Sequence, residues 1–250
     1  MIKVLICGAC GKMGANLIEL LASDCEAAAI CGVDMSGDKC AIPVYPSFDK
    51  AEDKVDVIID FSSPAVLDGE LEYAKAHRVP LVIASTGFTQ EQLDSIAEAA
   101  KSIAVFRTAN FSLGVNLICE LVKKAAQTLG DGFDIEIIEK HHNKKADAPS
   151  GTAIMLAESA NCAFGKSKPY LYGRSGLIGK RGNEIAIHAV RGGTIVGEHE
   201  VDFCGEDEII TVTHSARSRK VFAAGAIKAA KWIIGKDAGL YDMKDMLKEI

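Results

Sequence analysis

The first 110 residues alternate short apolar runs with segments whose apolar positions recur at helical spacing. The runs of strand length are 2–7, 27–33, 55–61, 79–84 and 103–106, and the helical segments are 15–21, 62–77 and 89–101. This alternation predicts a parallel, doubly wound sheet of the Rossmann type. In such a sheet ligands bind beyond the carboxyl ends of the strands.

The pattern changes after residue 112. A long apolar helix at 113–129, a strand at 133–139 and a helix ending near 164 come first, and extended runs follow at 184–190, 194–203 and 208–214. These runs predict a mixed or antiparallel sheet. Helices at 218–234 and 243–250 close the chain. The fold class is therefore α/β, with an N-terminal Rossmann-like doubly wound parallel sheet and a second α+β domain.

Composition narrows the class of protein. At 250 residues and 48% hydrophobic, the chain is long enough for one large or two small cores, and its net charge of -6 argues against a nucleic-acid surface. The N-terminal run reads as a core strand and not as a signal peptide. No stretch reaches the ~20 uninterrupted apolar residues that would span a bilayer. We expect a cytoplasmic protein with no membrane partner.

Eight cysteines are spread along the chain, mostly among apolar neighbours. This placement favours free thiols that pack as small hydrophobic groups. Cys7 and Cys10 form a C-x-x-C pair, which leaves a redox or metal site as a second reading. Because they flank Gly8 in a glycine-rich turn and no second ligand pair accompanies them, we expect no metal site.

A glycine-rich turn follows the first strand. Gly8-Ala9-Cys10-Gly11-Lys12-Met13-Gly14 has the spacing G-x-x-G-x-x-G, a variant of the dinucleotide fingerprint. The first glycine permits the tight turn, the second lets a pyrophosphate approach the backbone, and the third lets the helix pack on the strand. Its position between an apolar run and a helical pattern strengthens the prediction of a dinucleotide site.

Asp34 ends the second predicted strand, 20 residues after Gly14. Its carboxylate is placed to accept hydrogen bonds from an adenosine ribose and to repel a 2′-phosphate. Met35 stands next to it, where a reader of that phosphate would often be arginine. These two residues favour NADH over NADPH, although Lys39 offers a compensating charge.

The most distinctive stretch is 136–153, which gathers His141, His142 and three lysines (140, 144 and 145) before a predicted helix. Ser150 is a good N-cap, and the N–H groups of Gly151, Thr152 and Ala153 would face outward as an anion site. Histidine and lysine among cations suit general acid chemistry. The bend therefore predicts a carboxylate or phosphate cradle beside a proton donor, against the alternative of a solvated basic loop.

These two stretches resemble the dihydrodipicolinate reductase (4-hydroxy-tetrahydrodipicolinate reductase) family. The resemblance rests on Gly8–Gly14 and on the pattern E-x-H-H-x-x-K-x-D-x-P-S-G-T-A at 139–153, with further matches at 60–62, 85–88, 109–116 and 197–199. It covers essentially the whole chain. Ala84 departs from the family's usual glycine, and Met35 from the arginine of many members.

The resemblance implies reduction of a cyclic imine dicarboxylate to tetrahydrodipicolinate with NADH or NADPH, in the diaminopimelate route to lysine. His141 would then be a proton donor or acceptor, and Lys145 the other proton donor. The dicarboxylate substrate would be bound by His142, Ser150, Gly151 and Thr152. The cofactor-binding residues would be Gly8, Ala9, Cys10, Gly11, Lys12, Met13, Asp34, Ala84, Ser85, Thr86, Thr108, Ala109, Asn110 and Phe111. The implied domains are 1–112 with 221–250 for the dinucleotide, and 113–220 for the substrate and for assembly into a homotetramer.

Two other classes stay open at this point. An aspartate or homoserine dehydrogenase would share the strand, turn and helix of the N-terminus, but is not expected to carry the paired histidines before Lys145 and Ser150. A non-catalytic nucleotide sensor would keep Gly8–Gly14 but has no use for a cluster of cationic acids. His188, His199 and His214 are interpreted as packing residues of strands or loops, with a position facing the cleft as the alternative for each.

Overall fold

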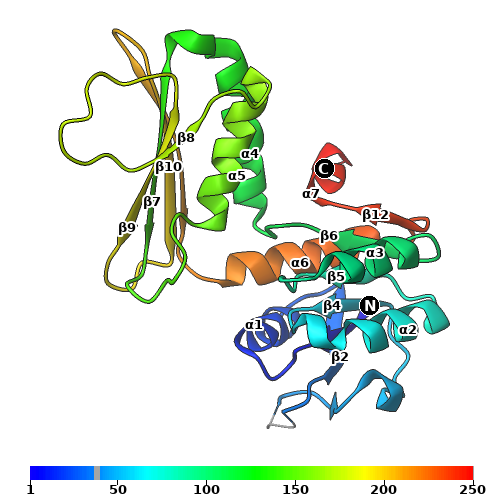
Figure 1. The fold of residues 1–250 in the computed structure, drawn as a ribbon. Coiled ribbons are helices and arrows are strands. Elements are labelled where there is room, and N and C mark those ends of the chain that lie inside the picture. Colours follow the sequence, from blue (N-terminus) through cyan, green and yellow to red (C-terminus); the bar gives the residue numbers. More distant parts are fainter. Residues whose placement is uncertain (37–39, 250) are drawn as a thin grey trace. The chain divides into compact units, whose positions relative to one another are not determined.

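The computed structural model describes residues 1–36 and 40–249, so Lys39 lies outside the described residues. The chain forms two compact units, Met1–Ser112 with Arg219–Ile250, and Leu113–Ser218 (Figure 1). Each unit has a hydrophobic core of its own. None of the described helices is long and apolar enough to cross a membrane.

The first unit is built on a seven-stranded sheet in the order β12-β6-β5-β4-β1-β2-β3, and every neighbouring pair is parallel. The strands are β1 (Ile2–Cys7), β2 (Ala27–Val33), β3 (Val44–Tyr45), β4 (Val57–Asp60), β5 (Leu81–Ile83), β6 (Ala104–Arg107) and β12 (Gly239–Tyr241). The Rossmann-like parallel sheet predicted from the sequence is thus confirmed. Strands β3 and β12 were not predicted, because two or three residues carry no periodic pattern.

Helices pack on this sheet in two layers. They are α1 (Lys12–Leu21), α2 (Leu67–His77), α3 (Gln90–Ala99), α6 (Lys220–Ile233) and α7 (Met243–Glu249), with short 3₁₀ turns at Phe48–Lys50 and Pro64–Val66. Leu5 and Ile58 belong to the core that includes residues of α2 and α3. Their neighbours Ile6 and Ile59 are equally buried and point to the opposite face, as strand geometry requires. Burial on both faces explains why these strands read as continuous apolar runs.

The second unit has a five-stranded mixed sheet in the order β11-β10-β7-β9-β8. Its strands are β7 (Asp134–His141), β8 (Tyr170–Tyr172), β9 (Ile185–Arg191), β10 (Gly197–Cys204) and β11 (Ile209–Ala216). β10 pairs antiparallel with β7 and β11, while β9 pairs parallel with β7 and β8. The prediction of a mixed sheet is confirmed. β8, which lies in a glycine-rich stretch without alternation, was not predicted.

Two helices of this unit, α4 (Leu113–Leu129) and α5 (Gly151–Asn161), pack side by side on one face of the sheet (Figure 1). A 3₁₀ turn follows each of them, at Gly130–Gly132 and at Cys162–Phe164. Ile135 and Ile137 of β7 point into the core beneath the helices. Strand β7 continues to His141, two residues beyond its predicted end, so residues 139 and 141 share the face of Ile135 and Ile137.

Candidate active site

The glycine-rich turn of the first unit has the geometry that its spacing predicts. Gly8 has a φ of +80°, which a residue with a side chain adopts only with strain. The N–H of Gly11 donates to the carbonyl of Gly8 at 3.1 Å and closes the turn. A Cβ on Gly14 would lie 2.3 Å from that same carbonyl oxygen, so the third glycine lets α1 pack closely on the turn.

The first turn of α1 favours an anion. Gly11 occupies the N-cap position without a side-chain cap, and the first turn contains no acidic residue. Backbone N–H groups at such a helix start, together with the helix dipole, attract a phosphate. Lys12 is exposed beside them, whereas Ala9 is buried and offers a nucleotide no exposed side chain. These residues fit a dinucleotide pyrophosphate.

Asp34 lies at the carboxyl end of β2, next to the glycine-rich turn. Its Oδ2 accepts from the N–H of Cys10 at 3.0 Å, and its Oδ1 accepts from the N–H and hydroxyl of Ser36. Burial opposes ionisation, but these hydrogen bonds outweigh it and lower the pKa of Asp34. A groove of about 650 Å³ is lined by Val33, Met35 and residues of α2, and Asp34 is not among its lining residues.

Three further strand ends complete this edge of the sheet. Asp60 accepts from the N–H and hydroxyl of Ser62 and from the hydroxyl of Ser85, and so ties the end of β4 to the end of β5. The side chain of Ser85 is thereby turned inward. Beyond it, Ala84 is half-buried and Thr86 is exposed.

Residues 108–112, which follow β6, include both exposed and buried residues. Thr108 is half-buried and Ala109 is exposed, while the Asn110 Oδ1 accepts from the N–H of Ser112 at 2.8 Å. Phe111 is buried, and its ring packs on Phe106 at 5.8 Å between centroids. Phe111 is one of the predicted cofactor-binding residues, and its side chain belongs to the core of the unit.

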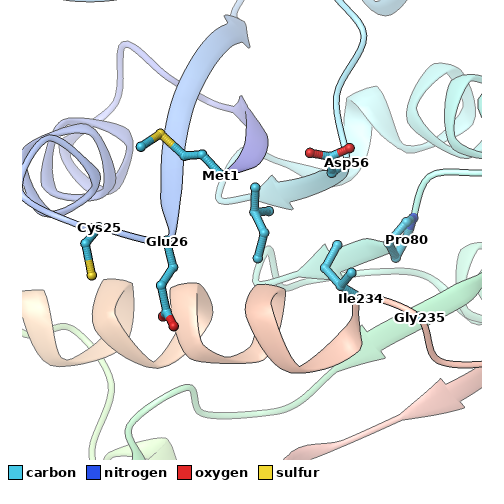
Figure 2. A pocket seen from close by; sticks show the side chains of 8 residues that line it. Met1, Cys25, Glu26, Asp56, Pro80, Ile234 and Gly235 are labelled. Atoms are coloured by element: carbon cyan, nitrogen blue, oxygen red, sulfur yellow. The ribbon is translucent and has the colours of Figure 1, made fainter.

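A separate hollow of about 590 Å³ lies at the other edge of the sheet (Figure 2). It is lined by Met1, Ile2, Cys25, Glu26, Asp56, Pro80, Ile234 and Gly235. Most of these residues stand at or just before the amino end of a strand. Since ligands of doubly wound sheets bind at the carboxyl ends, this hollow is not a candidate for the dinucleotide.

In the second unit, Ser150 caps α5. Its hydroxyl accepts from the N–H of Ala153 at 3.2 Å, and its own N–H donates to Glu139 at 2.9 Å. The predicted anion cradle included the N–H of Ala153; that part was wrong, because the cap satisfies this group. Upstream of the cap, the Ala148–Pro149 peptide is cis.

Glu139 stands at the centre of this site and is fully buried. Arg191 donates to both of its carboxylate oxygens at 2.7 Å, and the Nδ1 of His141 lies 2.6 Å from Oε2. Burial alone would raise the pKa of Glu139, but the Arg191 and His141 hydrogen bonds outweigh it and lower that pKa. Glu139 is thus a charged acceptor that holds both a predicted proton donor and the Ser150 turn.

His199 joins the same cluster from β10. Its Nε2 lies 3.0 Å from the hydroxyl of Ser150, and its ring meets the His141 ring edge-on at 5.1 Å between centroids. Burial, and then the neighbouring His141, lower the pKa of His199 to about 4, so this ring is neutral near pH 7. The interpretation of His199 as a packing residue missed this contact with the Ser150 turn.

The bend between β7 and α5 carries the remaining predicted residues. The ammonium of Lys145 pairs with the carboxylate of Asp147 at 2.9 Å, and that contact lowers the pKa of Asp147. His142 is half-buried, and its Nδ1 has no hydrogen-bond partner among the described residues. Lys140 alternates to the other face of the sheet, where it pairs with Glu198, and so leaves the predicted basic cluster.

Sequence reasoning also missed Arg191, which β9 brings beside β7. It left Glu139 without a role, although the spacing of Glu139 and His141 by two residues on a strand indicates a shared face. His188, by contrast, pairs with Glu136 at 2.7 Å, on the face opposite to Glu139. Nothing in the sequence of β7 itself identifies Arg191 of β9 and His199 of β10 as partners of Glu139.

A nucleotide-type sheet in one unit, with a buried cluster of acid, histidine and arginine in the other, defines a two-domain nucleotide-dependent oxidoreductase. Residues 2–111 match the family model of the dihydrodipicolinate reductase N-terminus, and residues 114–247 match that of its C-terminus. The chain belongs to the dihydrodipicolinate reductase family. The dehydrogenase and sensor alternatives are thereby set aside.

Individual proteins agree with the family models. A 4-hydroxy-tetrahydrodipicolinate reductase of Caldanaerobacter subterraneus is 48% identical over 100% of this chain and 99% of that protein, and one of Clostridium novyi is 43% identical over 99% of each. A dipicolinate-bound dihydrodipicolinate reductase from Paenisporosarcina sp. TG-14 superposes with a TM-score of 0.80 at 25% identity, covering 97% of both chains. A scyllo-inositol dehydrogenase from Lactobacillus casei shares only the fold, with a TM-score of 0.58 at 14% identity over 100% of this chain and 90% of that one.

Proposed function

We propose that the protein is a 4-hydroxy-tetrahydrodipicolinate reductase, which reduces the cyclic imine dicarboxylate to tetrahydrodipicolinate with NAD(P)H in the diaminopimelate route to lysine. Membership of the family supports this proposal. The observation that carries it beyond resemblance is the buried Glu139, which joins His141 to the capped start of α5. Reduction of this dicarboxylate requires a proton donor next to a turn that binds a carboxylate.

In this proposal the first unit binds the dinucleotide. The residues are Gly8, Ala9, Cys10, Gly11, Lys12, Met13, Asp34, Ala84, Ser85, Thr86, Thr108, Ala109, Asn110 and Phe111, of which Ala9, Ser85 and Phe111 would act through their backbone. Bound NAD(P)H supplies the hydride. The N–H groups at the start of α1 would hold the pyrophosphate, and the Asp34 carboxylate would accept from the ribose hydroxyls.

The second unit would supply protons and bind the diacid. His141 and Lys145 would deliver the proton that the ring carbon next to the reduced one takes up. His142, Gly151 and Thr152 would hold a substrate carboxylate. The hydroxyl of Ser150 is engaged with Ala153 and His199, so Ser150 would act by shaping the turn. The charge of Lys145 complements a dianionic substrate.

NADH is the proposed preferred cofactor. The carboxylate of Asp34, whose pKa is lowered, would repel the 2′-phosphate of NADPH. Met35 is exposed beside it and offers that phosphate no charge. The NADH preference is therefore a consequence of two adjacent residues.

We further propose a cytoplasmic homotetramer that assembles through the second unit. All eight cysteines are free thiols, as befits a reducing compartment. Among the described residues, both helices of the second unit pack on one face of its sheet (Figure 1), which leaves the other face for a partner. Light scattering that gave the mass of a single chain would contradict this part.

A spectrophotometric assay tests the proposed reaction. The substrate is generated in place by condensing pyruvate with aspartate semialdehyde, and the loss of NADH or NADPH absorbance is followed. We expect oxidation that requires all components and is faster with NADH. Oxidation that proceeds without the condensation product, or no oxidation with either cofactor, would refute the assignment.

A further inference from the structure

Strand register brings four polar side chains of the second unit together. Glu139 and His141 share one face of β7 because they are two residues apart. His199 of β10 is the register partner of Glu139, and Arg191 of β9 is the register partner of His141. Three strands thus converge on one buried carboxylate.

The carboxylate of Glu139 is completely engaged. Oε1 accepts from Arg191 and from the N–H of Ser150, while Oε2 accepts from Arg191 and faces the Nδ1 of His141. The bidentate guanidinium supplies the countercharge that a fully buried carboxylate needs. This degree of hydrogen bonding fixes the position of every group attached to Glu139.

An ionised carboxylate only accepts hydrogen bonds, so the Nδ1 of His141 carries a proton. The Nε2 is then the atom left to give and take a proton. A Cβ on residue 197 would lie 3.0 Å from this Nε2, so Gly197 keeps the space beside it open. The other titratable or charged groups around His141 are Arg191 and the neutral His199, with Lys145 on the adjoining bend.

Arg191 also reaches the bend that carries Lys145. Its Nη2 donates to the carbonyl oxygen of Asp147 at 2.7 Å, while the carboxylate of Asp147 pairs with Lys145. One guanidinium is therefore linked to His141 and Ser150 through Glu139, and to Lys145 through Asp147. The proposed proton donors and the carboxylate-binding turn all depend on this one side chain.

We propose that Glu139 and Arg191 are positioning residues: together they hold His141 in the Nδ1–H tautomer and fix both the Lys145 bend and the Ser150 turn, without touching the substrate. This inference rests on the proposed function for its kinetic consequence. Its structural part, the tautomer of His141, is independent of turnover.

The test compares Glu139→Gln and Arg191→Lys with a matched control, Arg174→Met. Arg174 makes a bidentate ion pair with Glu136 on the same strand but on the opposite face. The glutamine has nearly the same shape as Glu139, so the fold should be preserved. It lacks the negative charge that requires a proton on the Nδ1 of His141. The lysine keeps the charge of Arg191 but cannot bind both oxygens in the same plane.

We expect kcat to fall roughly 100-fold in Glu139→Gln and at least about 10-fold in Arg191→Lys, with NADH affinity unchanged. Imidazole ¹⁵N NMR should show one His141 tautomer in the parent and a mixture in Glu139→Gln. Arg174→Met should lose thermal stability and keep both kcat and the single His141 tautomer.

A single Nδ1–H tautomer of His141 in Glu139→Gln would overturn the proposal. Equal loss of kcat in an Arg174→Met protein that keeps the parent's assembly state would also overturn it, since the effect would then be merely structural. If the parent protein shows no turnover, the proposed function fails, and the NMR result still decides the positioning claim by itself.

Discussion

Gly14→Ala tests how closely α1 packs on the glycine-rich turn. The added Cβ would lie 2.3 Å from the carbonyl oxygen of Gly8 and 2.4 Å from that of Ala9. A carbon and an oxygen rest at about 3.3–3.6 Å, so the helix or the turn must move by roughly 1 Å. Both obstructing atoms belong to the backbone and cannot rotate away.

Gly14→Ala should lower the free energy of unfolding. Overpacking of this kind costs about 3 kcal/mol at the upper end of its usual range, and replacing a helical glycine offsets about 1 kcal/mol. The expected net loss of about 2 kcal/mol lowers the Tm by roughly 4–8 °C. A displacement of roughly 1 Å in the N–H groups that we propose hold the pyrophosphate should weaken NADH binding by at least about 10-fold.

Calorimetry and NADH fluorescence titration measure these two effects. Gly69→Ala is the matched control, because Gly69 is an exposed helical glycine whose Cβ would meet nothing within 4 Å. It should gain about 0.5–1 kcal/mol of stability and bind NADH normally. A Gly14→Ala protein that melts and binds NADH like the parent would refute the close-packing argument.

Three further substitutions address other parts of the account. Lys145→Ala should reduce turnover by about 100-fold or more while NADH still binds; normal turnover removes Lys145 from the mechanism. Asp34→Ser should raise the NADPH-to-NADH ratio of kcat/KM about tenfold, and an unchanged ratio would count against Asp34 as the selector. Glu70 is fully buried, and burial followed by repulsion from Asp60 raises its pKa well above the usual 4.5. The folded chain therefore retains a proton that the unfolded chain releases, so stability falls as the pH rises above 4.5. Glu70→Gln should remove this decline and gain Tm relative to the parent between pH 5 and 8; parallel curves would contradict it.

The sequence predicted best what is encoded locally. The β1 strand, the turn of Gly8–Gly14 and α1 are specified by apolar runs and glycine spacing within twenty residues. Ser150 as the cap of α5 followed from its neighbours in the chain. These features depend on backbone geometry and not on distant partners.

The parts that could not be predicted depend on strand pairing. Arg191 and His199 reach Glu139 only because β9 and β10 flank β7 in a particular register. Because β7 extends to His141, Lys140 points to the opposite face of the sheet from Glu139 and His141. The clustering of basic residues in the sequence does not indicate this separation. The Ala153 N–H is not part of the anion cradle, because the Ser150 hydroxyl that caps α5 accepts its hydrogen bond.

The most direct test of the central claim follows the hydrogen atoms of the reduction. The protein is incubated with the condensation product of pyruvate and aspartate semialdehyde and with NADH deuterated at the transferable position, and the product is examined by mass spectrometry and NMR. We expect one deuterium per tetrahydrodipicolinate at a single ring carbon, with a solvent-derived hydrogen at the neighbouring carbon. A ring product without deuterium, or deuterium recovered only in water, would contradict the assignment of this chain as the reductase.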